Sequence, residues 1–208
     1  MNFDALRYVG AVTREIQSRM YEGRPARVLI ASCAYDTSQE DLWDAITNPE
    51  RIPRWFAPVT GDFRIGGHYQ VEGNAGGEIT DCQPPRHLAL TWGMGGDVSW
   101  VNVELSPRND GGARLRLEHI AHVPDEFWNE YGPGAVGVGW DLAFLGLRYF
   151  FSLRERLEHE TWPLTAHGKA FVNQCSEAWA GASIASGTDE AAARAAAERT
   201  TAFYTQGA

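Results

Sequence analysis

Residues Tyr35–Gly67, YDTSQEDLWDAITNPERIPRWFAPVTGDFRIGG, are the most informative about the fold, because they predict two short helices between strands. Thr37 and Glu40 have the spacing of a capping box, in which each side chain accepts a hydrogen bond from the other residue's backbone N–H. We therefore expect a first helix over residues 38–46.

A second helix start follows at Asn48 and Pro49. Asparagine is a good N-cap, and proline at the first helical position lacks only an N–H that would be unbonded anyway. We expect this helix over residues 49–56. Two short helices inserted after the first strand of a sheet are an unusual order, and that order narrows the choice of fold.

The rest of the chain up to residue 120 alternates apolar and polar side chains with a period of two, which indicates strands. The alternating segments are 63–65, 69–71, 88–92, 101–105 and 115–119, and a first strand is expected over 27–35. Glycine- and proline-containing turns separate them, which predicts an antiparallel sheet with one apolar face. Residues 133–159 then carry apolar side chains at helical spacing, and this long helix is expected to cover that face.

The two ends of the chain predict further helices. Apolar residues at three- and four-residue spacing indicate an amphipathic helix over residues 3–20, and two helices are expected after residue 160. Since the sequence shows no linker and no internal repeat, we expect one domain over residues 1–208. It would consist of an N-terminal helix (1–22), a core (26–157) and a helical extension (161–208).

Several motifs within residues 26–157 resemble the helix-grip (START-like, SRPBCC, Bet v 1-like) superfamily, in the branch of the activators of heat-shock protein 90 ATPase. The matching segments are NPERIPRWFAP (48–58), Gly66-Gly67, Gly77-Glu78-Ile79, PPRHLALTW (84–92), the alternating segments 101–105 and 115–119, and Gly139-Trp140. The resemblance implies an α+β fold in which a curved antiparallel sheet grips a long helix and encloses a cavity. Members of the superfamily include lipid carriers, polyketide cyclases, hormone receptors and co-chaperone modules, so the resemblance implies no single function.

Composition excludes several function classes. The net charge is −9 and Lys169 is the only lysine, which argues against nucleic acid as a partner. The three cysteines lie far apart in sequence, which is typical of free thiols in the cytoplasm. The most apolar run, residues 142–153, contains Arg148 and is too short to span a bilayer, so no membrane partner is expected.

The candidate ligand-binding residues are mostly aromatic. They are Trp55, Phe56, Tyr69, Trp92, Val103, Leu117, His119, Trp140 and Phe144. Taken singly, each is explained by packing. Taken together, they come from elements that surround the cavity in a helix-grip fold, and an aromatic lining with a few polar groups is typical of a small-molecule site.

His119 shares strand parity with Leu115 and Leu117, so it is expected on the concave face. It is then either a core histidine satisfied by a hydrogen bond, or a polar anchor or proton donor for a ligand. His122 lies three positions further along the strand and faces the other way, so no metal site is predicted. Asp141 near the start of the long helix is explained by the helix dipole.

Gly132–Gly137 matches the glycine spacing of a dinucleotide-binding loop. However, such a loop must follow a strand and open a βαβ unit, and neither condition is met, so no cofactor is expected. We interpret Gly134, Gly137 and Gly139 as small residues that let the long helix lie close to the sheet.

Three functions remain open. The first is binding of a hydrophobic small molecule between sheet and long helix, with His119 orienting it and no catalytic group. The second is a polyketide cyclase- or aromatase-like enzyme with His119 as acid or base. The third is a co-chaperone-like interaction module with a chaperone partner. Self-association as a homodimer through the terminal helices is also left open.

Overall fold

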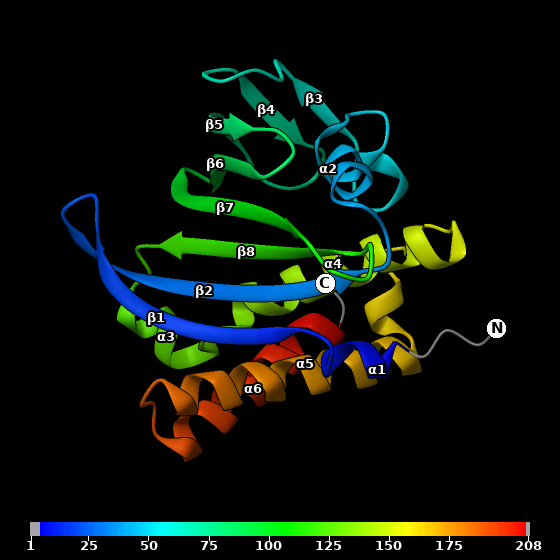
Figure 1. Ribbon diagram of the computed structural model, residues 1–208. Coiled ribbons are helices and arrows are strands. Elements are labelled where there is room, and N and C mark those ends of the chain that lie inside the picture. Colours follow the sequence, from blue (N-terminus) through cyan, green and yellow to red (C-terminus); the bar gives the residue numbers. More distant parts are fainter. Residues whose placement is uncertain (1–4, 207–208) are drawn as a thin grey trace.

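Eight strands form one curved antiparallel sheet in the computed structural model, which describes residues 5–206 (Figure 1). The strands are β1 (Thr13–Tyr21), β2 (Arg24–Tyr35), β3 (Val59–Gly61), β4 (His68–Val71), β5 (Gly76–Gln83), β6 (His87–Met94), β7 (Asp97–Pro107) and β8 (Ala113–Ala121). Their order across the sheet is β1-β2-β8-β7-β6-β5-β4-β3, and all neighbours are antiparallel.

Helices cover one face of this sheet. They are α1 (Leu6–Val9), α2 (Gln39–Thr47), the 3-10 helix η1 (Ile52–Arg54), α3 (Asp125–Tyr131), α4 (Gly134–Leu153), the 3-10 helix η2 (Trp162–Leu164), α5 (Ala166–Ala185) and α6 (Glu190–Thr205). In Figure 1, α4 lies behind the sheet, α5 and α6 lie next to the β1 edge, and α2 lies toward the β3 end. The α+β helix-grip fold expected from the sequence is confirmed.

The core lies between the concave face of the sheet and α4. Leu29, Leu105 and Leu115 from the sheet and Leu145 from α4 are each at most 4% exposed and belong to one apolar cluster. The period-two pattern of the strands places these residues on the same face as the helix. The core therefore forms where the sequence predicted an apolar face in need of a cover.

The predicted helix over residues 3–20 is wrong for most of its length. Of the described part of this segment, residues 5–20, only Leu6–Val9 is helical. Thr13–Tyr21 is the edge strand β1. Glu22 and Gly23 have φ values of 46° and 77°, the conformation of a tight hairpin turn, and they fold β1 back onto β2. Pairing with β2 thus overrides the helical spacing. Residues 1–4 of the predicted N-terminal helix and 207–208 of the predicted extension lie outside the described residues.

The segment between β2 and β4 differs from expectation in detail. The cap of α2 is Ser38, whose hydroxyl accepts from the backbone N–H of Asp41 at 3.2 Å, and not Thr37. The second predicted helix shrinks to the single 3-10 turn η1, although Asn48 does accept from the N–H of Glu50. The strand expected around residues 63–65 is a loop, because β3 ends at Gly61.

The long helix α4 ends at Leu153, earlier than the expected residue 159. Arg154 adopts the left-handed conformation (φ 58°) and stops the helix. By length and composition alone α4 could cross a membrane, but 61% of its apolar window is buried inside the protein. We therefore describe α4 as a buried core helix.

The glycines at the start of α4 face the C-terminal helices, which corrects the expectation that they approach the sheet. A Cβ atom on Gly137 would lie 2.3 Å from Cε2 of Trp179 in α5, and one on Gly134 would lie 3.0 Å from Cγ2 of Thr200 in α6. A Cβ atom would overlap the Trp179 ring at Gly137 and would be crowded by Thr200 at Gly134, so these glycines allow α5 and α6 to dock closely on α4.

Asp141 does not lie at the start of the long helix, as expected, but two turns inside α4, where it makes several buried contacts. Its carboxylate accepts from Arg14 Nη2 at 2.9 Å and Nε at 3.2 Å, and from the Trp179 indole N–H at 2.9 Å. The side chains of Asp141 and Arg14 are 1% and 5% exposed. Burial raises the pKa of Asp141, and the Arg14 guanidinium opposes that rise. The helix-dipole explanation of Asp141 is therefore wrong, because Asp141 lies two turns inside α4, and the dipole acts only within the first turn. The ion pair with Arg14 and the Trp179 hydrogen bond instead tie β1 and α5 to α4.

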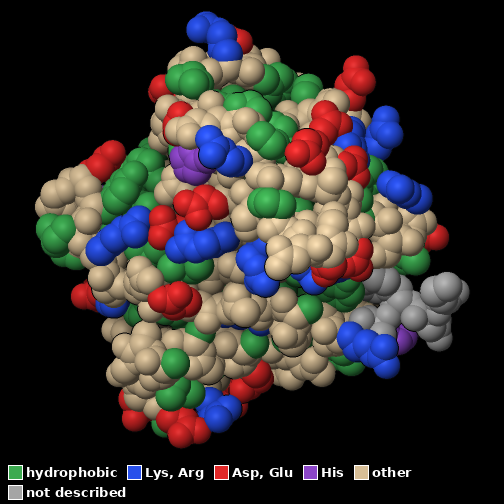
Figure 2. Space-filling view, in the orientation of Figure 1, with side chains coloured by type: hydrophobic (Ala, Val, Ile, Leu, Met, Phe, Trp, Pro, Cys, Tyr) green, Lys and Arg blue, Asp and Glu red, His purple; other side chains and the backbone are tan. Residues whose placement is uncertain are grey.

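The surface mixes both signs of charge. Figure 2 shows acidic and basic side chains next to each other across one face of the molecule. Ion pairs on the outer side of the sheet include Arg19–Glu118 at 3.0 Å and Arg116–Glu104 at 3.8 Å. On the face in Figure 2, basic side chains are interspersed with acidic ones.

Candidate ligand-binding cavity

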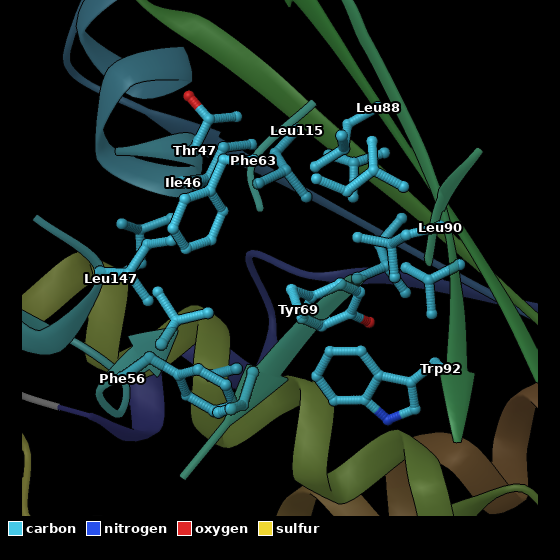
Figure 3. Close-up of a pocket in the computed structure, with 18 of the residues that line it drawn as sticks. Ile46, Thr47, Phe56, Phe63, Tyr69, Leu88, Leu90, Trp92, Leu115 and Leu147 are labelled. Carbon is cyan, nitrogen blue, oxygen red and sulfur yellow. The ribbon is translucent and has the colours of Figure 1, made fainter. Parts of the chain in front are cut away.

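A cavity of about 200 Å³ lies between the concave face of the sheet and α4 (Figure 3). Its walls are almost entirely apolar. They consist of Ile46, Thr47, Ile52, Trp55, Phe56, Val59, Phe63, Arg64, Tyr69, Val71, Ile79, Cys82, Leu88, Leu90, Trp92, Val101, Val103, Leu115, Leu117, Trp140, Ala143, Phe144 and Leu147. Figure 3 shows Tyr69 and Trp92 beside each other at one end and Ile46, Thr47 and Phe63 at the other.

The sheet supplies one wall through strand alternation. Leu88, Val103 and Leu117 lie at paired positions on β6, β7 and β8, so they form one row across the sheet. Leu90 on β6 and Val101 on β7 form the neighbouring row. Because every second side chain points to the same face, these rows follow directly from the period-two pattern.

The helix α4 supplies the opposite wall. Trp140, Ala143, Phe144 and Leu147 follow the spacing of three and four residues that places side chains on one face of a helix. The face that carries Asp141 and the glycines points to α5 and α6 instead. Helix α4 is thus shared between the cavity and the C-terminal helices.

The third wall is the α2–η1–β3 segment, which is held by specific hydrogen bonds. The Trp55 indole N–H donates to the Ala45 carbonyl at 2.8 Å, and His159 Nε2 donates to the Trp55 carbonyl at 2.8 Å. The rings of Trp55 and Phe56 stack with centroids 5.5 Å apart. The chain after α4 therefore supports this wall from behind through His159.

The polar atoms of the wall are mostly bonded to the protein itself. The Tyr69 hydroxyl donates to the Thr91 carbonyl at 2.7 Å, and the Thr47 hydroxyl donates to the Trp43 carbonyl at 2.8 Å. Burial raises the pKa of the Tyr69 phenol and of the Cys82 thiol, so both groups stay neutral at neutral pH. Such a lining offers a ligand apolar contact and few directed hydrogen bonds.

Arg64 is the exception, since it is the only charged residue among the described residues that line the cavity. It lies in the loop between β3 and β4, which backbone hydrogen bonds between Ile79 and both Gly66 and Gly67 hold against β5. Its Nε donates to Asp62 at 2.7 Å, which leaves the two Nη atoms as further donors. Arg64 is therefore a cation with spare donors at the rim.

His119 lies behind the wall and does not line the cavity. It is 5% exposed, and both ring nitrogens have partners: Nδ1 accepts from the Trp140 indole N–H at 2.9 Å, and Nε2 lies 2.8 Å from the Ser99 hydroxyl. Because Trp140 is a donor only, the proton of a neutral His119 must sit on Nε2. Burial lowers the pKa of His119 to about 4, so the ring is neutral at neutral pH.

The structure brings eight of the nine candidate residues together in the wall, all except His119. Among the residues not singled out from the sequence are Leu88, Leu90 and Leu115, although they share strand parity with residues that were. Trp100 packs against Tyr21 on the outer face of the sheet, with ring centroids 4.8 Å apart. Arg64 gave no sequence signal because its segment was expected to be a strand.

No group of three or more histidine, cysteine or acidic side chains within residues 5–206 is arranged to hold a metal ion. The three cysteines in this part of the chain are free thiols. The cavity is therefore characterised by apolar contact, one rim cation and a buried histidine behind it.

Solved structures of other proteins have a similar fold. The crystal structure of CalU16 from Micromonospora echinospora superposes with a TM-score of 0.67 at 33% identity, over 83% of this chain and 98% of that one. DynU16, described as a protein of the dynemicin biosynthetic locus, shares the fold at 17% identity and a TM-score of 0.51, over 60% of this chain and 47% of that one.

A curated relative is the human activator of 90 kDa heat shock protein ATPase homolog 1, which is 33% identical over an alignment of 79 residues; the match covers 34% of this chain. The chain spans only 23% of that protein's length. The model of the family described as "Activator of Hsp90 ATPase homolog 1-like protein" matches residues 36–150, more than half of the chain. On this match, together with the CalU16 similarity, the chain belongs to the activator of Hsp90 ATPase homolog 1-like family.

Proposed function

We propose that this protein binds an apolar small molecule in the cavity between the sheet and α4. The observation that carries the proposal is a cavity of about 200 Å³, open at its rim, with apolar walls. Protein interiors are close-packed, and an unfilled apolar void costs stability, so a space of this size is typical of a binding site. An engineered apolar cavity of about 150 Å³ is already large enough to bind benzene.

The bonding of the wall supports an apolar ligand body. The hydroxyls of Tyr69 and Thr47 and the indole N–H of Trp55 donate to backbone carbonyls. A ligand group that needs several hydrogen bonds would lose those it made to water without replacement, which costs free energy. Binding would instead follow the apolar area that the ligand buries, at roughly 25 cal/mol per Å² before association costs.

The ligand's polar end is best placed at the rim beside Arg64. His119, which the sequence suggested as an anchor, has both ring nitrogens hydrogen-bonded to Ser99 and Trp140 and does not line the cavity. The Nη atoms of Arg64 have the geometry to receive a carboxylate or a similar anion. Since Asp62 already shares this guanidinium and the rim is exposed, the preference for an anion would be modest.

Binding is tested by isothermal titration with two ligands that share one ring system, naphthalene-2-carboxylate and 2-naphthalenemethanol. We expect both to bind, the acid about two- to fivefold more tightly, as for an exposed ion pair. Val103→Trp, which fills the cavity, should abolish binding of both. Val98→Trp, on the exposed part of β7, should leave binding unchanged and is the matched control.

Arg64→Gln should remove the preference for the acid while the alcohol still binds, whereas Arg54→Gln, a change at an exposed arginine outside the wall, should not. The binding proposal fails if neither ligand binds, nor any apolar compound carried by the purified protein in native mass spectrometry. It also fails if Val103→Trp binds as well as the parent. Equal affinity for acid and alcohol would remove only the role of Arg64.

A chaperone partner is the second candidate, favoured by the family match and by the name of the human relative. The shared segment covers a small part of that relative, so its activity belongs to this chain only as a proposal. The test is the ATPase rate of purified heat-shock protein 90 with and without this protein. An unchanged rate and no complex by gel filtration would remove this candidate. We propose a cytoplasmic location, because free cysteines are typical of that compartment and both a chaperone and a small-molecule ligand could be met there.

The cyclase-like alternative receives little support from the site. It would need His119 to exchange a proton with a ligand, yet both ring nitrogens are bonded to protein groups and the ring lies behind Trp140. A general acid or base must come within hydrogen-bond reach of the reacting atom. Turnover of a polyketide-like substrate that disappears in His119→Ala would reinstate this alternative.

A further inference from the structure

We propose that His119 is a positioning residue, which acts through Trp140 to fix the aromatic end of the cavity and so sets a preference for flat aromatic ligands over flexible chains. This inference rests on the proposed binding function. Its evidence is a chain of hydrogen bonds that runs behind the cavity wall and ends on two of the residues that form it.

The chain has a single consistent direction. The Trp140 indole N–H donates to His119 Nδ1 at 2.9 Å, His119 Nε2 donates to the Ser99 hydroxyl at 2.8 Å, and that hydroxyl donates to the Trp92 carbonyl at 2.6 Å. Every proton in this chain has one acceptor. Helix α4 is thereby joined through β8 and β7 to β6, the strand that carries Trp92.

The chain fixes the orientation of Trp140 in particular. An indole N–H is a donor only, and leaving it buried without an acceptor is unfavourable, because it loses its hydrogen bond to water without replacement. His119 Nδ1 is the acceptor of this N–H. Rotation of the Trp140 side chain would break this bond, so the face that Trp140 presents to the cavity is set by a residue that does not touch the cavity.

Trp140 is the first of three neighbouring aromatic rings at this end of the cavity. The rings of Trp140 and Trp92 lie with centroids 5.1 Å apart, and those of Trp92 and Tyr69 lie 6.4 Å apart. Tyr69 is in turn held by its bond to the Thr91 carbonyl. Figure 3 shows Tyr69 and Trp92 adjacent at this end of the cavity. All three rings line it, and together they offer pre-oriented aromatic surface.

Pre-orientation favours one ligand shape over another. Aromatic pairs gain about 0.5–1.5 kcal/mol beyond their buried area, but only at defined ring geometries. An alkyl chain gains from area alone and adapts to a moved ring. Loss of the His119 bonds should therefore weaken binding of a flat ring system more than binding of a chain.

The test compares naphthalene-2-carboxylate with nonanoate, whose shared carboxylate cancels the contribution of the rim. In the parent protein we expect the aromatic acid to be favoured by about two- to tenfold. His119→Leu removes both hydrogen bonds and should abolish this preference. His119→Gln retains an acceptor for Trp140 and a donor for Ser99, so it should restore the preference.

Val28→Ala controls for simple loss of stability, because Val28 is fully buried in the cluster on the opposite face of the sheet. It should leave the ratio of the two affinities unchanged. The inference is overturned if a folded His119→Leu keeps the parent's ratio, or if His119→Gln loses the preference as fully as His119→Leu. If the parent binds neither acid, nor 2-naphthalenemethanol, nor a co-purified apolar compound, it is the binding function that fails. If the parent binds one of the latter two but neither acid, this inference is overturned. If His119→Leu does not fold, the comparison of His119→Gln with His119→Asn decides, since the shorter amide cannot keep both bonds and should lose the preference.

Discussion

Burial keeps His119 neutral, and this links the stability of the protein to pH. The pKa of His119 is lowered from 6.5 to about 4 because the charged ring would lose its hydration. Below pH 6.5 the unfolded chain binds a proton at this position, whereas the folded chain does not until about pH 4. The stabilisation is thus fully present above pH 6.5 and is lost as the pH falls toward 4.

We expect the free energy of unfolding to drop by about 3 kcal/mol from this residue between pH 6.5 and pH 4, as an upper figure. Urea unfolding at pH 7.5, 6.5, 5.5 and 4.5 measures it. His119→Gln should show a shallower decline over the same range. Burial also lowers the pKa of His159, which contributes in the same direction and remains in both proteins. Parallel pH profiles for parent and variant would contradict the linkage.

Individual residues of the cavity could be predicted from the sequence, but the contacts of His119 could not. Strand parity and aromatic character were enough to identify residues such as Tyr69 and Trp92, because both are properties of the local sequence. Parity also placed His119 on the concave side. It gave no information on whether the ring reaches the cavity, since that depends on Trp140 and Ser99, which come from elsewhere in the chain.

At the scale of elements, Asp141 joins three segments that are distant in sequence. Its carboxylate binds Arg14 from β1 and Trp179 from α5, and Arg14 Nη1 donates to the carbonyls of Val9 and Val12 at 2.9 and 3.0 Å. Removing one partner of a buried ion pair leaves the other charge without compensation, which typically costs about 3–5 kcal/mol.

We therefore expect Asp141→Asn to lower the free energy of unfolding by about 3 kcal/mol or more. A double-mutant cycle with Arg14→Gln, followed by urea unfolding, should show strong coupling between the two positions. Glu104→Gln with Arg116→Gln, an exposed pair on the outer face, is the matched control and should change stability by less than about 1 kcal/mol. Additive effects of the two substitutions on the free energy of unfolding would show that Asp141 and Arg14 do not stabilise the fold as a pair.

The N-terminal segment shows how element prediction failed. Leu6, Val9, Val12 and Ile16 have helical spacing, and local propensity alone favours a helix there. The turn at Glu22 and Gly23 allows residues 13–21 to pair with β2 along their whole length. Backbone pairing to a neighbouring strand outweighs a weak local preference, and the sequence signal for that pairing is the two-residue turn at Glu22 and Gly23.

At the scale of the whole molecule, ligand binding should raise thermal stability, because a ligand that binds only the folded state shifts the unfolding equilibrium. At a ligand concentration of about 100 times Kd the gain is about 2.7 kcal/mol. For a chain of this length that corresponds to a rise in Tm of about 5–10 °C. Calorimetry with naphthalene-2-carboxylate measures it, and an equal rise in Val103→Trp would show that the effect arises outside the cavity.

The helix-grip architecture was predictable from the sequence because alternating strands, turn residues and one apolar helix each carry a local signal. The docking of α5 and α6 was not, because it depends on contacts such as Gly137 with Trp179 that no local pattern reports. The glycines were noticed in the sequence, but the elements that approach them come much later in the chain.

The glycines of α4 have a consequence for anyone who shortens this protein. A fragment that stopped at residue 157 would still contain the family segment of residues 36–150, so the cut would look harmless. It would lack Trp179 and Thr200, so the bare backbone at Gly134 and Gly137 would open to water along an apolar groove. The Asp141 carboxylate, which pairs with Arg14, would lose the Trp179 indole N–H as a donor at the same place. Fragments made for expression should therefore keep α5 and α6. If a shorter fragment aggregates, we expect the cause to be this exposed groove rather than the ligand cavity.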